Sequence, residues 1–246
     1  MDKKKVITYI SITFTITWIC WWGLALLSKK GILDSSQGIF TVMHLMGGFG
    51  PTIASVMVLP DKSSKSVLKF VFSCKKNAVW YLFLFCLMQG LIIGLASMET
   101  NPAMPWFTTP IVLFSTTFLG GGNEELGWRG IMQPELEKKF SFPIATLITG
   151  WVWMLWHIPL WFVAGTSQQS MNFALYAMYG LILSFWLATI YKKTKSVFCC
   201  CVFHGFSNLM LSFFIVKINW LLILGLAVSL AFTIWLYYKD DANVSN

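Results

Sequence analysis

The chain has 246 residues, of which 57% are hydrophobic, 17% are aromatic and only 11% are charged. A water-soluble domain of this length needs far more charge to cover its surface. The composition therefore excludes that class and indicates a membrane protein with several spans. The net charge of +8 favours loops that face anionic lipid over a nucleic-acid partner.

The apolar runs predict an all-α bundle. A run at 6–27 follows the basic start MDKKK and, at about 22 residues, is longer than the apolar part of a signal peptide, so we expect an uncleaved span. The second run, 39–59, contains GGFGP at 47–51, which predicts a kink or a close helix contact. Further runs bring the expected count to about eight spans in a single domain over 1–246: 78–97, 107–122, 142–164, 171–191, 197–215 and 218–238.

The positions of the lysines and arginines predict the orientation of these spans. If the N-terminus is cytoplasmic, about 15 of the 18 Lys and Arg residues fall in cytoplasmic segments, and the other side holds Lys29, Lys30 and Lys217. Basic residues concentrate on the cytoplasmic side of membrane proteins. The sequence therefore predicts that both termini are cytoplasmic.

The six cysteines do not predict a disulfide framework. Most of them lie inside apolar runs, and no CxxC pair occurs, so we interpret them as small apolar residues. Cys200 and His204 are four residues apart and could form half of a metal site on one helix face.

Ionisable side chains within spans are costly, so each one suggests a functional site. The segment GGGNEELGWRG, residues 120–130, carries two carboxylates and one arginine. If 123–138 is helical, Asn123 is a candidate N-cap, and Glu125 and Arg129 share a face and can pair. Glu124 then points about 100° away from that face. The alternative reading is a capped surface helix whose acidic first turn complements the helix dipole.

Two other segments repeat this four-residue spacing of polar groups. Trp153 and His157 share a helix face in WMLWH, and His204 and Asn208 share one in HGFSN. Either histidine alone is typical of a hydrogen-bonded core residue, and we interpret the isolated His44 as structural. Together the three segments supply a carboxylate, two imidazoles and a carboxamide, which are groups that can activate water and stabilise an oxyanion.

The motifs EELGWR at 124–129, WMLWH at 153–157 and HGFSN at 204–208 resemble those of the CAAX protease and bacteriocin-processing (CPBP or Abi) family of membrane proteases, written EExxxR, FxxxH and HxxxN. The resemblance covers a motif core over about 107–215, and GGFGPTIA at 47–54 resembles a glycine-proline segment of the family. Trp153 departs from the usual phenylalanine of the second motif. Since that position supplies an aromatic surface, we expect little effect.

The resemblance implies a role for each matched residue. Glu124 is implied as the general base on water, His157 as the residue that positions or activates this water, and His204 with Asn208 as the oxyanion hole. Glu125 paired with Arg129 is implied as structural support, with Trp153 beside them. The resemblance implies no cofactor. A zinc site on Glu124, His157 and His204 is the alternative, but it leaves the asparagine unexplained.

The function implied is an intramembrane endopeptidase in a bacterial cell membrane, with a peptide or protein substrate. The resemblance suggests maturation of a leader or pheromone peptide, or self-immunity against a bacteriocin, ahead of cleavage of a prenylated CAAX tail. Two other classes stay open. One is an ion-coupled transporter, which the absence of an internal repeat disfavours, and the other is a non-catalytic membrane regulator whose polar pairs hold helices together.

Overall fold

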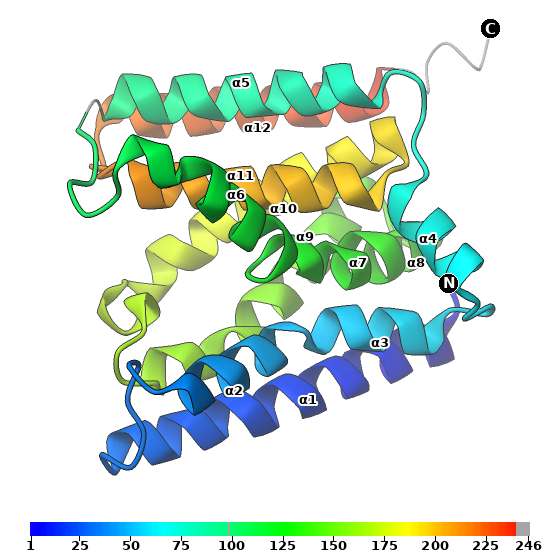
Figure 1. Cartoon of the computed structure of the whole chain (residues 1–246). Coiled ribbons are helices and arrows are strands. Elements are labelled where there is room, and N and C mark those ends of the chain that lie inside the picture. Colours follow the sequence, from blue (N-terminus) through cyan, green and yellow to red (C-terminus); the bar gives the residue numbers. More distant parts are fainter. Residues whose placement is uncertain (98, 240–246) are drawn as a thin grey trace, which may run out of the picture. The chain divides into compact units, whose positions relative to one another are not determined.

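The computed structural model describes residues 1–97 and 99–239 and is mainly helical (Figure 1). Among these residues the β structure is limited to an isolated antiparallel bridge between Thr100 and Phe214, so the all-α prediction is confirmed. The chain divides into two compact units. The first contains Met1–Val67 and Leu126–Ser184, and the second contains Leu68–Glu125 and the chain from Phe185 onward.

The helices follow the predicted apolar runs. By length and composition, five helical stretches in the described residues can cross a membrane, and the bent pair α2–α3 makes a sixth if it is one span. This makes the chain a multi-pass membrane protein. The five are α1 (Lys3–Lys29), α5 (Ala78–Ala96), α9 (Phe142–Trp156) with the 3₁₀ turn η4 (Ile158–Phe162), α10 (Phe173–Thr194) and α12 (Trp220–Tyr238).

The expected count of about eight spans is not reproduced by helix length. α11 (Val197–Phe213) has 17 residues, but α6 (Thr109–Phe118) has only 10 and is about 15 Å long, half of the hydrocarbon core. The apolar run 107–122 predicted a full crossing because hydropathy measures how apolar a stretch is and not where its helix ends, which is at Phe118. Cytoplasmic placement of the termini stays a prediction, and residues 240–246 lie outside the described part of the chain.

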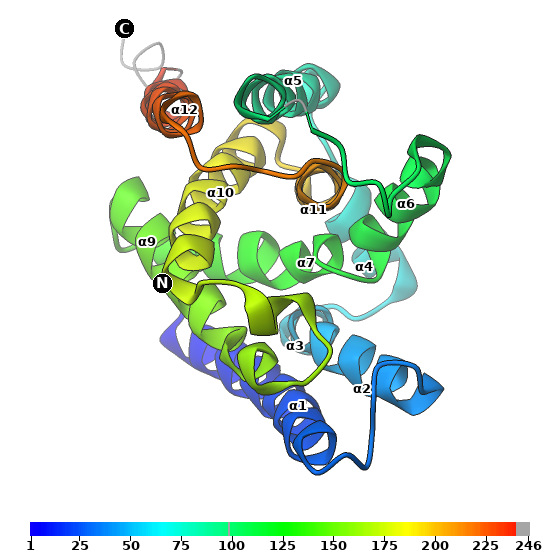
Figure 2. The ribbon, with the colours of Figure 1, turned by 90° about the vertical axis from the view of Figure 1, so that its left-hand side faces the viewer.

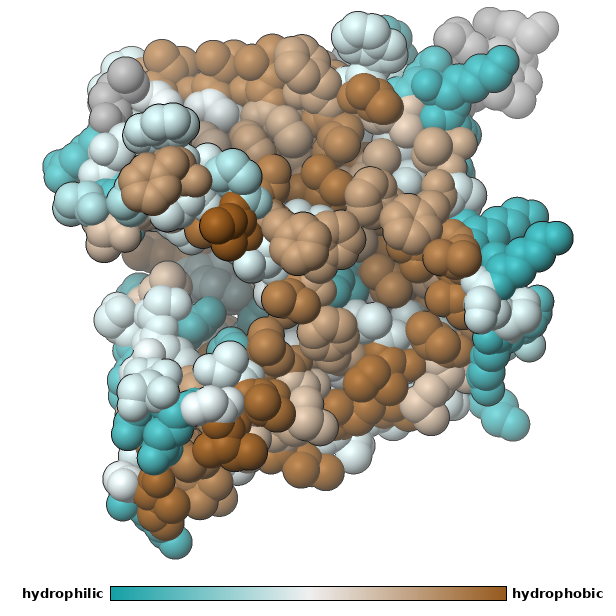
Figure 3. Space-filling model, viewed as in Figure 1, coloured by the Kyte–Doolittle hydropathy of each residue, from teal (hydrophilic) through white to brown (hydrophobic). Residues whose placement is uncertain are grey.

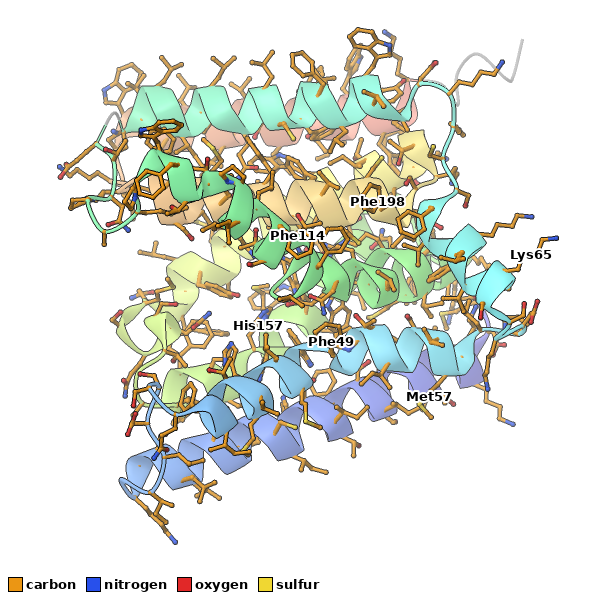
Figure 4. All side chains as sticks on the ribbon, in the orientation of Figure 1. Phe49, Met57, Lys65, Phe114, His157 and Phe198 are labelled. Carbon is orange, nitrogen blue, oxygen red and sulfur yellow. The ribbon has the colours of Figure 1, made fainter. Side chains whose placement is uncertain are left out.

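In the first unit, α1 lies along α2 (Gly38–Gly48) and α3 (Gly50–Val58), as Figure 1 shows. The two short helices meet at Phe49, labelled in Figure 4, with a bend of 40°. The Thr17 hydroxyl donates to the Gly47 carbonyl at 2.7 Å, and a Cβ on Gly50 would lie 2.9 Å from the Thr13 carbonyl oxygen. Both effects predicted from GGFGP, the kink and the close helix contact, are therefore confirmed.

Gly47→Ala is expected to destabilise the protein by about 1–3 kcal/mol through overpacking. Its Cβ would overlap the Trp21 indole nitrogen and lie 2.9 Å from Cε2 of the same buried ring. Gly48→Ala is the matched control, because no atom lies within 4 Å of its added Cβ. Thermal unfolding in detergent should show a lower Tm for the first variant only. Equal shifts in both variants would refute the packing argument.

The N-terminus of α1 is attached to α8 (Gln133–Glu137) through Glu135 in the same unit. This carboxylate accepts from the Asp2 backbone N–H at 3.0 Å and from Lys138 Nζ at 2.8 Å, and Lys5 Nζ lies 3.7 Å away. Burial opposes ionisation of the carboxyl, but the hydrogen bonds from Lys138 and Asp2 outweigh it and lower the pKa of Glu135.

Glu135→Gln is expected to lower the free energy of unfolding by about 1 kcal/mol at pH 7. Because the folded-state pKa is lowered, this stabilisation is complete above the ordinary glutamate value of about 4.3 and is lost as the pH falls below it. Unfolding measured at pH 7 and at about pH 3 should show the difference between wild type and variant shrinking with acid. A difference that does not change with pH would contradict the ionic contribution.

In the second unit α5 and α12 lie side by side, and α11 packs against α5 and α6 (Figures 1 and 2). A buried hydrogen bond joins α5 to α11, with Gln89 Nε2 donating to Ser207 Oγ at 2.8 Å. Figure 3 shows apolar side chains along α5, where Trp80, Leu87, Leu91 and Leu95 are exposed. An apolar surface of this kind suits contact with lipid tails.

Candidate active site

The segment that carries Glu124 and Glu125, residues 120–130, follows the end of α6 directly. After Phe118 the chain turns through Gly121, whose φ of +112° favours glycine. It then runs helically through the 3₁₀ turn η2 (Gly122–Glu124), α7 (Glu125–Gly127), the π-helical turn η3 (Trp128–Met132) and α8. The predicted helix over 123–138 is confirmed. The predicted N-cap is wrong, because the Glu124 N–H donates to the Gly121 carbonyl at 3.0 Å and Asn123 already lies inside the first turn.

The two carboxylates and one histidine of the second unit are buried. The exposed fractions are 5% for Glu124, 0% for Glu125 and 4% for His204. His204 Nδ1 lies 2.8 Å from Glu125 Oε1, a hydrogen bond that spans 79 positions of the sequence. Sequence reasoning did not predict this contact, since it looked for the partner of Glu125 one helical turn away.

His204 and Asn208 both face the turn that follows α6. Asn208 Nδ2 donates to the Gly120 carbonyl at 3.2 Å. A Cβ on Gly121 would overlap Asn208 Nδ2 and lie 3.0 Å from His204 Nε2. Gly121 was not singled out as a site residue, although the run of glycines at 120–122 was the available signal. The absence of a side chain at Gly121 lets two nitrogen atoms that can donate hydrogen bonds approach the backbone of the turn closely.

Close packing of α6 on α11 fixes this arrangement. The Thr116 hydroxyl donates to the Gly205 carbonyl at 2.9 Å, and a Cβ on Gly205 would lie 2.8 Å from the backbone nitrogen of Thr117. Gly205 lies between His204 and Asn208 in the sequence. The glycine therefore lets α11 approach α6 closely enough to place His204 and Asn208 against the turn.

In the first unit, His157 lies at the C-terminal end of α9 (Figure 4). Its Nδ1 is 2.9 Å from the Trp153 carbonyl oxygen. A carbonyl can only accept, so Nδ1 carries a proton. The other ring nitrogen, Nε2, is then the basic atom of the neutral imidazole.

Aromatic rings surround this imidazole in the same unit. The centroid distances from the His157 ring are 4.6 Å to Trp156, 5.5 Å to Trp153 and Tyr176, and 6.1 Å to Trp21. The buried Arg129 guanidinium lies over the Trp153 ring at 5.1 Å from its centroid. These contacts restrict the orientation of His157 and use Trp153 as an aromatic platform.

The candidate residues thus fall into two groups. In the second unit Glu125 contacts His204, and Asn208 contacts the turn that precedes the buried Glu124; the first unit brings together Arg129, Trp153 and His157. The boundary between the units falls after Glu125, within the helical segment itself. The Glu125–Arg129 pair stays a prediction. His44 stacks near Trp21 and Phe40, at ring distances of 5.8 Å and 6.4 Å.

Within either unit, the described residues contain no group of three or more His, Cys, Asp and Glu side chains placed to hold an ion. Cys200 Sγ donates to the Leu187 carbonyl at 3.6 Å, so it has a partner in the second unit other than a metal.

Comparison with known proteins places the three motifs in one family. Residues 104–210 match the family model described as type II CAAX prenyl endopeptidase Rce1-like. The chain is also similar to CAAX prenyl protease 2 of Methanococcus maripaludis, with 26% identity over 226 residues that cover 82% of each chain. The family match contains EELGWR, WMLWH and HGFSN in full.

Proposed function

The chain belongs to the CPBP family of CAAX-type membrane endopeptidases, and we propose that it hydrolyses a peptide bond with Glu124 as the general base on water. One observation carries the proposal. His204 Nε2 and Asn208 Nδ2 face the turn at Gly121, three residues before the buried Glu124. A base and two hydrogen-bond donors are therefore held in one unit.

The reaction follows from these groups. The Glu124 carboxylate takes a proton from water as the oxygen attacks the scissile carbonyl carbon, and the carbonyl oxygen becomes negative. Asn208 has two N–H donors on Nδ2, so one can bond to the Gly120 carbonyl while the other stabilises the oxyanion. When the tetrahedral intermediate collapses, protonated Glu124 returns its proton to the leaving amine.

His204 can donate to the same oxyanion only if Nε2 carries a proton. In an imidazolium ring both nitrogens carry a proton, so Nδ1 can donate to the Glu125 carboxylate while Nε2 donates to the oxyanion. Glu125 is then a positioning residue that acts through His204. The family resemblance assigned structural support to Glu125 through Arg129, and the hydrogen bond to His204 adds this second role.

His157 is proposed to position the attacking water. Its Nδ1 donates to the Trp153 carbonyl, which leaves the basic Nε2 as the atom that accepts from water. Arg129 over the Trp153 ring and the surrounding aromatic side chains support this orientation. The roles of His157 and Arg129 toward the reaction rest on the family motifs.

The substrate we propose is a leader or pheromone peptide, or a bacteriocin that the host must inactivate, at a bacterial cell membrane. The name of the archaeal relative indicates the other candidate, a prenylated CAAX tail. Mass spectrometry of small membrane-associated peptides should compare cells with the gene, without it, and complemented with Glu124→Ala. A peptide that matures only with the wild-type gene identifies the substrate. An identical peptide profile in all three strains would exclude peptide maturation.

Cleavage is expected to be insensitive to metal chelators. The proposed base and donors are protein groups, so removal of divalent cations should change kcat/KM less than twofold. Activity should be measured in detergent before and after treatment with a zinc chelator, with added Zn²⁺ as the control for recovery. Loss on chelation with recovery on Zn²⁺ addition would favour the zinc alternative.

A further inference from the structure

We propose that helix α4 (Ser64–Phe72) lies in the membrane surface and binds anionic phospholipid headgroups through the face formed by Lys65, Leu68, Lys69 and Phe72. These four residues are called the α4 basic face. Lipid binding there is independent of peptide hydrolysis. Figure 4 shows the labelled Lys65 side chain extending away from the α4 ribbon, and Figure 3 shows hydrophilic side chains in that region.

Helical geometry places the four residues on one side. Lys65 and Lys69 are four apart, as are Leu68 and Phe72, so at 100° per residue the face covers a sector of about 100°. Leu68 is 58% exposed and Phe72 is 52% exposed. The other side carries the half-buried residues Ser66, Val67, Phe70 and Val71. The helix therefore turns two lysines and two large apolar side chains outward together.

The end of α4 is tied to the ends of longer helices in the second unit. The Phe72 ring lies 5.2 Å from Phe198 at the start of α11, and the Lys75 N–H donates to the carbonyl of Thr194, the last residue of α10, at 2.8 Å. α5 begins at Ala78. Because α5 and α10 are candidate spans, their ends lie at the membrane surface. α4 is thereby placed at the depth of the headgroups.

The positive charge around the α4 basic face indicates that its binding partner is anionic. The stretch 61–77 contains five exposed lysines and one acidic residue, Asp61, which accepts hydrogen bonds from Ser63. Within residues 1–97 and 99–239 none of these lysines forms an ion pair with a carboxylate. Phosphate groups of anionic lipids can supply the missing counter-charge, while Leu68 and Phe72 reach the acyl boundary. An acidic protein would match the lysines but leave the apolar side chains unexplained.

The test is a lipid titration of the purified full-length protein followed by native mass spectrometry, with phosphatidylglycerol as the anionic probe and phosphatidylcholine as the neutral one. The double variant Lys65→Gln with Lys69→Gln should weaken the apparent Kd for phosphatidylglycerol roughly ten- to thirtyfold at low salt. Binding of phosphatidylcholine should be unchanged. Lys65→Arg with Lys69→Arg keeps both charges and should bind like wild type.

The matched control is Lys29→Gln with Lys30→Gln, which removes the same charge from two exposed lysines of α1 and its C-cap. It should bind phosphatidylglycerol within about twofold of wild type, and melting temperatures identify any variant that fails to fold. Equal affinity in the Lys65/Lys69 and wild-type proteins, or equal losses in both glutamine variants, would overturn the proposal. Loss of function in cells with unchanged lipid affinity would do so as well, and would indicate an acidic protein partner.

Discussion

Glu124→Gln is expected to reduce peptide cleavage by about 10²–10⁴-fold in kcat/KM, the range for loss of a general base. The amide keeps the shape of the buried side chain but cannot take a proton from water. Cleavage should be measured in detergent with the peptide identified in cells, and folding should be followed by the melting temperature. Equal cleavage by wild type and variant would eliminate the proposed base.

Two other Glu→Gln variants in the same helical segment sharpen this test. Glu137, which accepts from Gln133 Nε2 at 2.8 Å, is the control and should keep wild-type activity when changed. Glu125→Gln should lose less than Glu124→Gln, because an amide oxygen at this position can still accept from His204 Nδ1. Solute flux that depends on Glu124, with no cleavage of any peptide, would support the transporter alternative.

Gly121→Ala is expected to lower kcat by at least 10²–10³-fold, the typical cost of one oxyanion-hole donor. The added Cβ would displace Asn208 Nδ2 and lie 3.0 Å from His204 Nε2, so it disturbs both proposed donors. The backbone φ of +112° adds strain for any residue other than glycine. Single-turnover kinetics would show the loss in the chemical step.

The control for this variant is Gly94→Ala in α5 of the same unit, where no atom lies within 4 Å of the added Cβ. It should retain wild-type kcat. Gly120→Ala, with no atom within 4 Å and no left-handed φ, should lose far less activity than Gly121→Ala. Equal losses of activity in the alanine variants at 120 and 121 would show that the close approach of His204 and Asn208 to Gly121 is not what catalysis requires.

Much of the helical layout could be predicted because it depends on local features. Runs such as 78–97 and 218–238 appear as single helices of nearly the expected length, α5 and α12. The kink at GGFGP could be predicted because proline and glycine disturb the helix in which they themselves lie. The end of α6 was missed because hydropathy stays high through Leu119, although the three glycines that follow are a signal that a helix ends. The turn is set by the positive φ of Gly121, which hydropathy does not encode.

The site contacts were harder to predict than the site residues. Spacing rules identify partners within one helix, so they paired Glu125 with Arg129 and His204 with Asn208. In the structure Glu125 reaches His204 on α11, and Arg129 lies over Trp153 of α9. Such contacts depend on which helices pack together, and that information is distributed over the apolar faces of several segments. The prediction of Asn123 as the N-cap was wrong because the helical segment already begins at Gly122, within the three glycines that precede Asn123.

The early end of α6 has a consequence for hydration. The turn that follows it contacts Asn208, twelve residues into the 17-residue α11, so irregular backbone lies beside the interior of a helix rather than beside its end. Within a bilayer, non-helical backbone is stable only where protein covers it or water reaches it. Protein bonds satisfy part of this turn, because Ser115 accepts from the Leu119 and Gly120 N–H groups. Water that solvates the remainder of the turn would be available as the reactant to the proposed base Glu124, three residues after Gly121.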